Sequence, residues 1–400
     1  MKYEWRKKHI MPNVVMPFMA SMLMMGTSPA SAADYQEALP AEELGQTDIL
    51  PDELPLAWVY AQYLVAPSTI DNKVELFDLD GKDPTYIRGQ IAASYFPNML
   101  QGTARPELYI SETFFSRGTR GDRTDVITVY DKRTLAPTGE IPLPGNKRGL
   151  LVTKPNAFQF TDKEKLGLVF NFTPAASVTV VDLVERKVVG DVEIPGCALI
   201  YPTGPRGFSS LCGNGTLLSI QVDKNGKLIS EVESKPFNKL DDDPLYSKPA
   251  AIDQKNYFVS YLGHVQPIDL RGKKPKIGKK WSLLTPEEAK ENWRPSAAYP
   301  VTADSRGHLY VLMSPDGFDG SHRDDGKEIW VFNIKKKKKV RTIKMTNGGQ
   351  GMAITNEDTP RLLVATSSRK LDVYNPETGE ALNSFNMPTW GPAILIPVKR

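Results

Sequence analysis

The stretch "VITVYDKRTLAPTGEIPLP", Val126–Pro144, returns in outline about fifty residues later as "SVTVVDLVERKVVGDVEIPG", Ser177–Gly196. Each stretch begins with alternating β-branched residues, passes an Asp and a charged turn, and ends in a second alternating segment that contains Ile-Pro. Such alternation is typical of half-buried strands, and Asp, Asn, Gly and Lys are typical of tight, exposed turns. The pair therefore predicts a strand–turn–strand unit that is copied along the chain.

Seven copies of this unit can be found in the sequence. They start at Val74, Val126, Val178, Leu217, His264, Glu328 and Leu371, at intervals of 52, 52, 39, 47, 64 and 43 residues. Most copies are preceded by another short strand and followed by one more, and four short strands at a period in the forties are typical of a β-propeller blade. We therefore predict an all-β, seven-bladed β-propeller with four-stranded blades over residues 56–400. Two β-sandwiches are the alternative, and they explain the even spacing less well.

The longest interval contains a predicted helical insertion, "LLTPEEAKENWRPS". Thr285 and Glu288 have the spacing of a capping box, and Pro286 occupies the first helical position. We expect a short helix that runs to about Asn292 and stops before Pro295.

The first residues of the chain have the pattern of a signal peptide. Residues 1–9 are basic, residues 10–26 are apolar, and "SPASA" offers small residues for cleavage after Ala32; a retained anchor is the weaker alternative. Residues 33–55 contain seven carboxylates and no Lys or Arg, which predicts an acidic, extended arm or a disordered tail. Four of the 50 basic and one of the 47 acidic residues lie in residues 1–32, which leaves 46 of each. Nothing in this balance favours nucleic-acid binding, and no later segment is apolar for long enough to span a membrane.

The two cysteines, Cys197 and Cys212, predict a disulfide, because an exported chain meets an oxidising compartment. Two buried free thiols are the alternative. The histidines of the mature chain, His264, His308 and His322, have no metal-ligand spacing to either cysteine, so we predict no metal site.

No catalytic motif stands out in the sequence, and we predict no catalytic residue on this chain. The Gly-rich stretches "CGNG", Cys212–Gly215, and "NGGQG", Asn347–Gly351, lack the strand-to-helix context of a nucleotide-binding loop and predict turns. The run Lys335–Lys339 falls where other copies have a hairpin turn and predicts a solvated tip; a docking patch for an acidic partner is the alternative.

Several long stretches resemble the large (heavy) subunit of the quinoprotein amine dehydrogenases. They are "RGTRGDRTDVITVYDKRTL", "FTPAASVTVVDL", "SLCGNGTLLSIQVDKNGK", "WSLLTPEEAKENWRP" and "LYVLMSPDGFDGSHRDDGKEIWVFN". Within that family they look closer to aromatic amine dehydrogenase than to methylamine dehydrogenase.

The resemblance implies a periplasmic α2β2 heterotetramer of two large and two small subunits. The small subunit holds tryptophan tryptophylquinone, amines are oxidised to aldehydes and ammonia, and electrons pass to a blue copper protein, azurin or amicyanin. The large subunit would be a scaffold that shapes the substrate channel. Through "ASYFPN", Tyr95 matches a Phe that lines this channel in the family, with Phe96 beside it; an aromatic packed between blades is the alternative.

Two other functions stay open at this point. One is the heavy chain of a methylamine dehydrogenase. The other is a stand-alone periplasmic propeller, either a binding module or a hydrolase with a central metal.

Overall fold

All seven repeat copies fold as strands. The computed structural model describes residues 49–50, 54–61, 72–82, 85–149, 153–388 and 393–398. The chain divides into Met1–Asp34 and Tyr35–Arg400, and the described residues all belong to the second unit. The predicted signal peptide and most of the predicted acidic arm lie outside the described residues, so both stay predictions.

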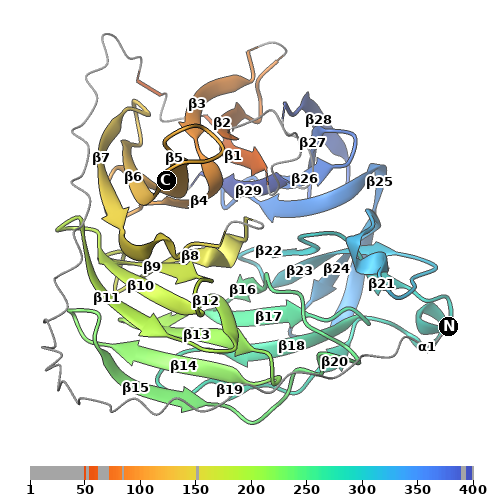
Figure 1. Cartoon of the computed structure of the whole chain (residues 1–400). Helices are drawn as coiled ribbons and strands as arrows, with labels where there is room; N and C mark the ends of the chain where they lie inside the picture. Colours follow the sequence, from red (N-terminus) through yellow and green to blue (C-terminus); the bar gives the residue numbers. More distant parts are fainter. Residues whose placement is uncertain are drawn as a thin grey trace, which may run out of the picture. The chain divides into compact units, whose positions relative to one another are not determined.

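The described strands form six antiparallel sheets arranged around a common centre, which their inner strands face (Figure 1). The first sheet contains β29 (Ala393–Pro397), β1 (Leu56–Ala61), β2 (Asn72–Asp78) and β3 (Ile87–Ala93). The second contains β4 (Tyr95–Gln101), β5 (Glu107–Phe115), β6 (Arg123–Asp131) and β7 (Pro137–Leu143). The third contains β8 (Phe158–Thr161), β9 (Leu166–Asn171), β10 (Ser177–Asp182) and β11 (Lys187–Glu193).

The other three sheets follow in chain order. The fourth contains β12 (Cys197–Gly204), β13 (Gly207–Cys212), β14 (Leu217–Val222) and β15 (Leu228–Glu233). The fifth contains β16 (Ala250–Ile252), β17 (Lys255–Val259), β18 (His264–Asp269), β19 (Lys276–Ile277) and β20 (Trp281–Ser282). The sixth contains β21 (Arg294–Pro295), β22 (Val301–Ala303), β23 (His308–Ser314), β24 (Gly326–Asn333), β25 (Lys338–Ile354), β26 (Leu362–Thr366), β27 (Lys370–Tyr374) and β28 (Ala381–Asn386). The inner strands that face the common centre are β29, β4, β8, β12, β16 and β22.

The prediction of seven separate four-stranded blades is wrong. Among the described residues, five sheets have the size of a blade, four with four strands and one with five, and the sixth sheet has eight strands. The eight-stranded sheet arises because β25 pairs with β24 through its first half and with β26 through its second half. The last two repeat copies, in β24 and β27, therefore lie in one sheet. The fold remains an all-β propeller.

The last two repeat copies share one sheet because the chain does not turn at Asn347–Gly351. The sequence predicts a turn there, but these residues continue β25. Gly348 and Gly349 are packed too closely to accept side chains. A Cβ on Gly349 would lie 2.7 Å from Leu312 Cδ2, and one on Gly348 would lie 2.6 Å from Asp325 Cβ. These glycines permit close packing within an extended strand rather than a reversal of the chain.

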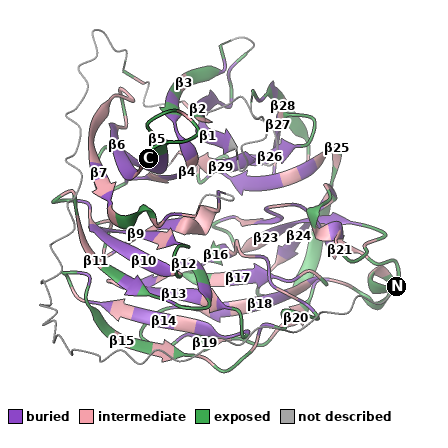
Figure 2. Cartoon of the chain, viewed as in Figure 1, coloured by how far each residue is buried: buried purple, intermediate pink, exposed green. Residues whose placement is uncertain are grey.

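The core lies between neighbouring sheets, and burial falls from the inner to the outer strands (Figure 2). One apolar cluster, for example, joins Tyr109 and Ile127 of the second sheet to Phe158 and Val169 of the third. The outer strand β15 is mostly exposed. Each sheet therefore buries both faces against its neighbours, as expected for stacked repeats.

The helical insertion is present and short. The helix α1 spans Pro286–Lys290, with Pro286 at its start and the predicted capping box between Thr285 and Glu288. Three 3-10 turns complete the helical content of the described residues: η1 (Pro144–Asn146), η2 (Pro155–Ala157) and η3 (Ser321–Arg323). No helix in the described part of the chain has the length and apolar character to cross a bilayer.

The connections between sheets define one rim of the propeller. In an antiparallel four-stranded sheet, the last strand ends on the side where the first strand begins. The turn between the second and third strands lies on that side too. Neighbouring first strands contact each other, as β4 contacts β8 and β8 contacts β12. The sheet-to-sheet connections and these turns therefore share one side, which we call the connector rim.

Candidate functional site

The disulfide fastens part of the connector rim. Cys197 begins β12 and Cys212 ends β13, and the two residues pair directly across the strands. Their sulfur atoms are 2.02 Å apart, so the predicted disulfide is confirmed. The bridge holds the inner strand of the fourth sheet to its neighbour, next to the turn formed by Cys212–Gly215.

The connector rim also presents exposed aromatic side chains. Phe114 is the last residue but one of β5, Phe172 follows β9, and Phe318 lies between β23 and β24; they are 41%, 63% and 59% exposed. They are the exposed phenylalanines of the described residues, and exposed Leu240 and Leu262 lie on the same rim. Six exposed aliphatic residues lie toward the opposite rim, at the starts of outer strands or in the turns before them: Ile87, Val184, Leu228, Ile229, Val340 and Leu382. The exposed aliphatic residues are thus spread over the molecule, whereas the exposed aromatic rings are gathered on the connector rim, and gathered rings of this kind favour a binding surface.

The predicted channel residues Tyr95 and Phe96 begin β4 at this rim. Tyr95 is 7% exposed and packs edge-on against Phe115, with ring centroids 5.5 Å apart. Its hydroxyl is buried without a hydrogen-bond partner among the described residues. Phe96 is half-buried and has a φ of 50°, at a bulge where β4 shifts register against β5. A left-handed Phe is a strained conformation of the kind that concentrates at functional sites.

Arg148 holds this bulge in place from the segment after η1. Its Nη2 donates to the carbonyl oxygens of Phe96, at 2.7 Å, and Ser111, at 2.9 Å, and its Nη1 donates to Thr113 Oγ1 at 2.7 Å. Burial lowers the pKa of Arg148 to about 10, although the nearby Asp125 and Glu112 carboxyls favour its charged form. The guanidinium therefore remains charged at neutral pH and fixes the backbone of Phe96.

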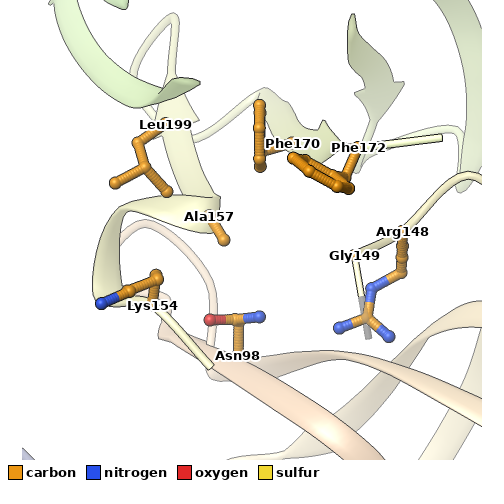
Figure 3. A pocket seen from close by; sticks show the side chains of 8 residues that line it. All are labelled: Asn98, Arg148, Gly149, Lys154, Ala157, Phe170, Phe172 and Leu199. Atoms are coloured by element: carbon orange, nitrogen blue, oxygen red, sulfur yellow. The ribbon is translucent and has the colours of Figure 1, made fainter. Parts of the chain in front are cut away.

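A cavity of about 120 Å³ lies beside Arg148 (Figure 3). Its walls come from β4, the connection between β7 and β8, the end of β9 and the start of β12. They include Asn98, Arg148, Lys154, Phe170, Phe172 and Leu199. Tyr95 and Phe96 do not line this cavity, but Asn98 follows them on β4. The site thus joins an apolar wall to two cationic side chains and one amide.

The sequence of the propeller matches the model of one protein family over nearly its full length. Residues 59–399 match the model described as methylamine dehydrogenase heavy chain (MADH). The chain belongs to this family. The expected resemblance to amine dehydrogenase large subunits is therefore confirmed, and the expected closer likeness to aromatic amine dehydrogenase stays a prediction.

Methylamine dehydrogenase heavy chains from several bacteria are similar in sequence to this chain over most of their length. The methylamine dehydrogenase heavy chain of Methylorubrum extorquens is 25% identical over 325 residues, which cover 80% of this chain and 78% of that one. The heavy chain of Methylobacillus flagellatus is 25% identical over 374 residues, covering 90% and 92%.

Solved structures of lower identity share the fold alone. A protein of Bacteroides fragilis described as a 6-phosphogluconolactonase has a TM-score of 0.58 at 11% identity, and the match covers 88% of this chain and all of that one. The dihydro-heme d1 dehydrogenase NirN, solved in complex with DHE, has a TM-score of 0.53 at 15% identity, and the match covers 87% of this chain and 66% of that one.

The centre of this MADH-family propeller is bridged by side chains. Tyr299 Oη donates to the carbonyl oxygen of Thr153 at 3.1 Å, and Lys248 Nζ donates to that of Met352 at 3.2 Å. Lys248 also lies 5.5 Å from the centre of the Tyr299 ring. Within the described residues, no group of three or more His, Cys, Asp or Glu side chains could hold a metal ion.

The histidines and the lysine run have structural contacts. His264 Nδ1 lies 2.9 Å from Asp243 Oδ2, and His308 Nδ1 lies 2.9 Å from Asp304 Oδ2. His322 stacks on Tyr261, and burial together with Arg323 lowers its pKa.

In the Lys335–Lys339 run, Lys335–Lys337 lie in an exposed turn between β24 and β25, and Lys338 and Lys339 begin β25. Lys339, also exposed, lies over the Trp330 ring and pairs with Glu288. The predicted tip is thus present, and a docking role for it stays untested.

Sequence reasoning missed Arg148, Asn98 and the cavity. The partners of Arg148 lie between 35 and 52 positions away in the sequence, so no local pattern points to it. The nearest usable signal was "ASYFPN", whose Pro97 interrupts an alternating segment and so indicates a bulge.

Proposed function

We propose that this chain is the non-catalytic large subunit of a periplasmic amine dehydrogenase with tryptophan tryptophylquinone on its small subunit. Membership of the MADH heavy chain family is the observation that supports it most strongly. The quinone supplies the oxidation of the primary amine to an aldehyde and ammonia, with electrons passing to a blue copper protein. This chain supplies a scaffold and one wall of the substrate channel, in an α2β2 heterotetramer.

We propose the connector rim as the surface that binds the small subunit. Phe114, Phe172 and Phe318 are exposed there, and burying such rings stabilises an interface by about 1.5–3 kcal/mol each. The disulfide and Arg148 keep this rim preorganised, which lowers the cost of association.

Replacement of Phe172 by Asp places a charge in the proposed interface and should weaken copurification of the small subunit at least tenfold. Leu228→Asp, on the outer strand β15 away from the connector rim, is the matched control. Equal losses for the two variants, or no loss for either, would place the interface elsewhere.

We propose an aromatic amine as the substrate class, because Tyr95, Phe96 and Phe115 form an aromatic group at the rim. Methylamine is the second candidate, and the names of the curated relatives favour it. The ratio of kcat/KM for phenylethylamine and methylamine, measured on the native complex, decides between them.

The experiment that tests the whole proposal compares the purified chain with the native complex, using a dye acceptor. The chain alone should show no turnover and no visible chromophore, and the complex should show both. Turnover by the chain alone would refute a non-catalytic role. Isolation of the native protein without any quinone-bearing small subunit would refute the assembly.

A further inference from the structure

The cavity beside Arg148 has the size and walls to accept one aromatic ring. Its volume is about 120 Å³, somewhat below the roughly 150 Å³ of an apolar protein cavity that binds benzene. Phe170, Phe172, Ala157 and Leu199 supply apolar walls, and Figure 3 shows the two Phe side chains on the side opposite Asn98. The walls thus favour a flat, apolar ligand body.

One buried side chain that lines this cavity, Asn98, has a polar atom without a partner among the described residues. Asn98 lines it, is 6% exposed, and has an Oδ1 that receives no hydrogen bond within the described residues. Ser111, which pairs with Asn98 from β5, also has a buried Oγ without a hydrogen-bond partner among the described residues, but it does not line the cavity. Buried polar atoms are almost always hydrogen-bonded, so the Asn98 amide beside the cavity indicates a missing polar partner. As placed, Oδ1 would accept from that partner, and the amide has to turn for its NH2 to donate into the cavity.

The charged groups at the cavity are both cationic. Arg148 and Lys154 are the ionisable residues of its lining, and no carboxylate lines it among the described residues. Asp125 and Glu112 lie near Arg148 and partly balance its charge. Burial alone accounts for the lowered pKa of Lys154, without a carboxylate to oppose it. An ammonium group would be repelled here, whereas a carboxylate would be attracted.

We propose that this cavity binds a small monocarboxylate with a single aromatic ring, the ring against Phe170 and Leu199 and the carboxylate toward Asn98 and Lys154. The Asn98 amide can turn its NH2 to the carboxylate, because that NH2 makes only a 3.4 Å contact with the Phe96 carbonyl. Figure 3 shows the Lys154 ammonium turned away from Asn98, so its flexible stem has to reorient to bring the charge to the carboxylate. This site would distinguish an aromatic acid from an aromatic amine.

The test measures benzoate and benzylamine binding to the purified mature chain by calorimetry. The two probes share a ring and differ in charge. Benzoate should bind at least tenfold more tightly than benzylamine. Lys154→Met should weaken benzoate roughly tenfold, the loss of about 1.4 kcal/mol expected for one charged contact. Lys336→Met, an equal charge change in the exposed turn before β25, should leave binding unchanged.

Two further outcomes complete the test. Ala157→Leu fills the cavity and should abolish the binding of benzoate. Benzylamine binding as tightly as benzoate would overturn the proposal, as would a structure at saturating benzoate that shows only ordered water beside Asn98. These measurements need no small subunit, so a failure here leaves the proposed function untouched.

Discussion

Replacement of Glu112 by Gln should remove a pH dependence from the stability of the fold. Glu112 is fully buried on β5, where Ser94 N donates to Oε2 and Thr128 Oγ1 donates to Oε1, both at 2.5 Å. Burial raises the pKa of its carboxyl from 4.5 to about 7, although both hydrogen bonds and Arg148 oppose that rise. Gln has the same shape and can keep an oxygen toward Ser94 while its NH2 faces the Thr128 hydroxyl.

The direction in which stability changes with pH follows from the number of protons that the folded and unfolded chains bind. Between pH 4.5 and pH 7 the folded chain holds a proton on Glu112 that the unfolded chain has released. The contribution of this group to stability is therefore complete below pH 4.5, falls as pH rises, and is lost above about pH 7. At about 1.4 kcal/mol per pH unit, wild type should lose about 2.5 kcal/mol relative to Glu112→Gln between pH 5 and pH 8.

Equilibrium urea unfolding at pH 5 and pH 8, followed by tryptophan fluorescence, measures this difference directly. Glu231→Gln, an exposed carboxylate on the outer strand β15, is the control and should show no such divergence. Equal m-values for wild type and variant are required for the comparison. Parallel stability curves for wild type and Glu112→Gln would refute the reasoning and indicate that Glu112 titrates as in the unfolded chain.

Two further predictions concern the connector rim. Replacement of both Cys197 and Cys212 by Ser should lower the free energy of unfolding by about 3 kcal/mol, because the bridge closes a loop of about 15 residues; equal urea midpoints would contradict this. Tyr95→Ala in the assembled complex should raise KM for aromatic amines about fivefold, within the roughly 0.5–1.5 kcal/mol of an aromatic contact, and leave short aliphatic amines unchanged. Tyr95→Phe is the control, and unchanged KM values in Tyr95→Ala would mean that Tyr95 only packs.

The strands were predictable because their signals are local. Every repeat copy, from Val74 in β2 to Leu371 in β27, alternates and ends in turn residues, and each is a strand in the structure. The division into sheets was less predictable, because Gly348 and Gly349 resemble a turn in sequence. Their packing against Asp325 and Leu312 decides that β25 continues.

The site was predictable only in part, for a related reason. The pairing of Cys197 with Cys212 follows from a cysteine count and an oxidising compartment, which the sequence alone suggests. The role of Arg148 depends on three acceptors that meet only when β4 and β5 pair and the chain returns after β7. Long-range contacts of that kind leave no periodic trace in a sequence.

The pairing of β29 with β1 means that the first sheet cannot be completed until the end of the chain has been synthesised. Ala57 is opposite Pro397, so the partners lie 340 positions apart, and β1 is synthesised long before its neighbour. At roughly 5–20 residues per second, translation leaves the inner edge of β1 unpaired for roughly 20–70 s. An unpaired edge is a template for wrong strand pairing. Until β29 has been synthesised, the nascent chain is therefore exposed to aggregation, and a chaperone bound to this edge would protect it.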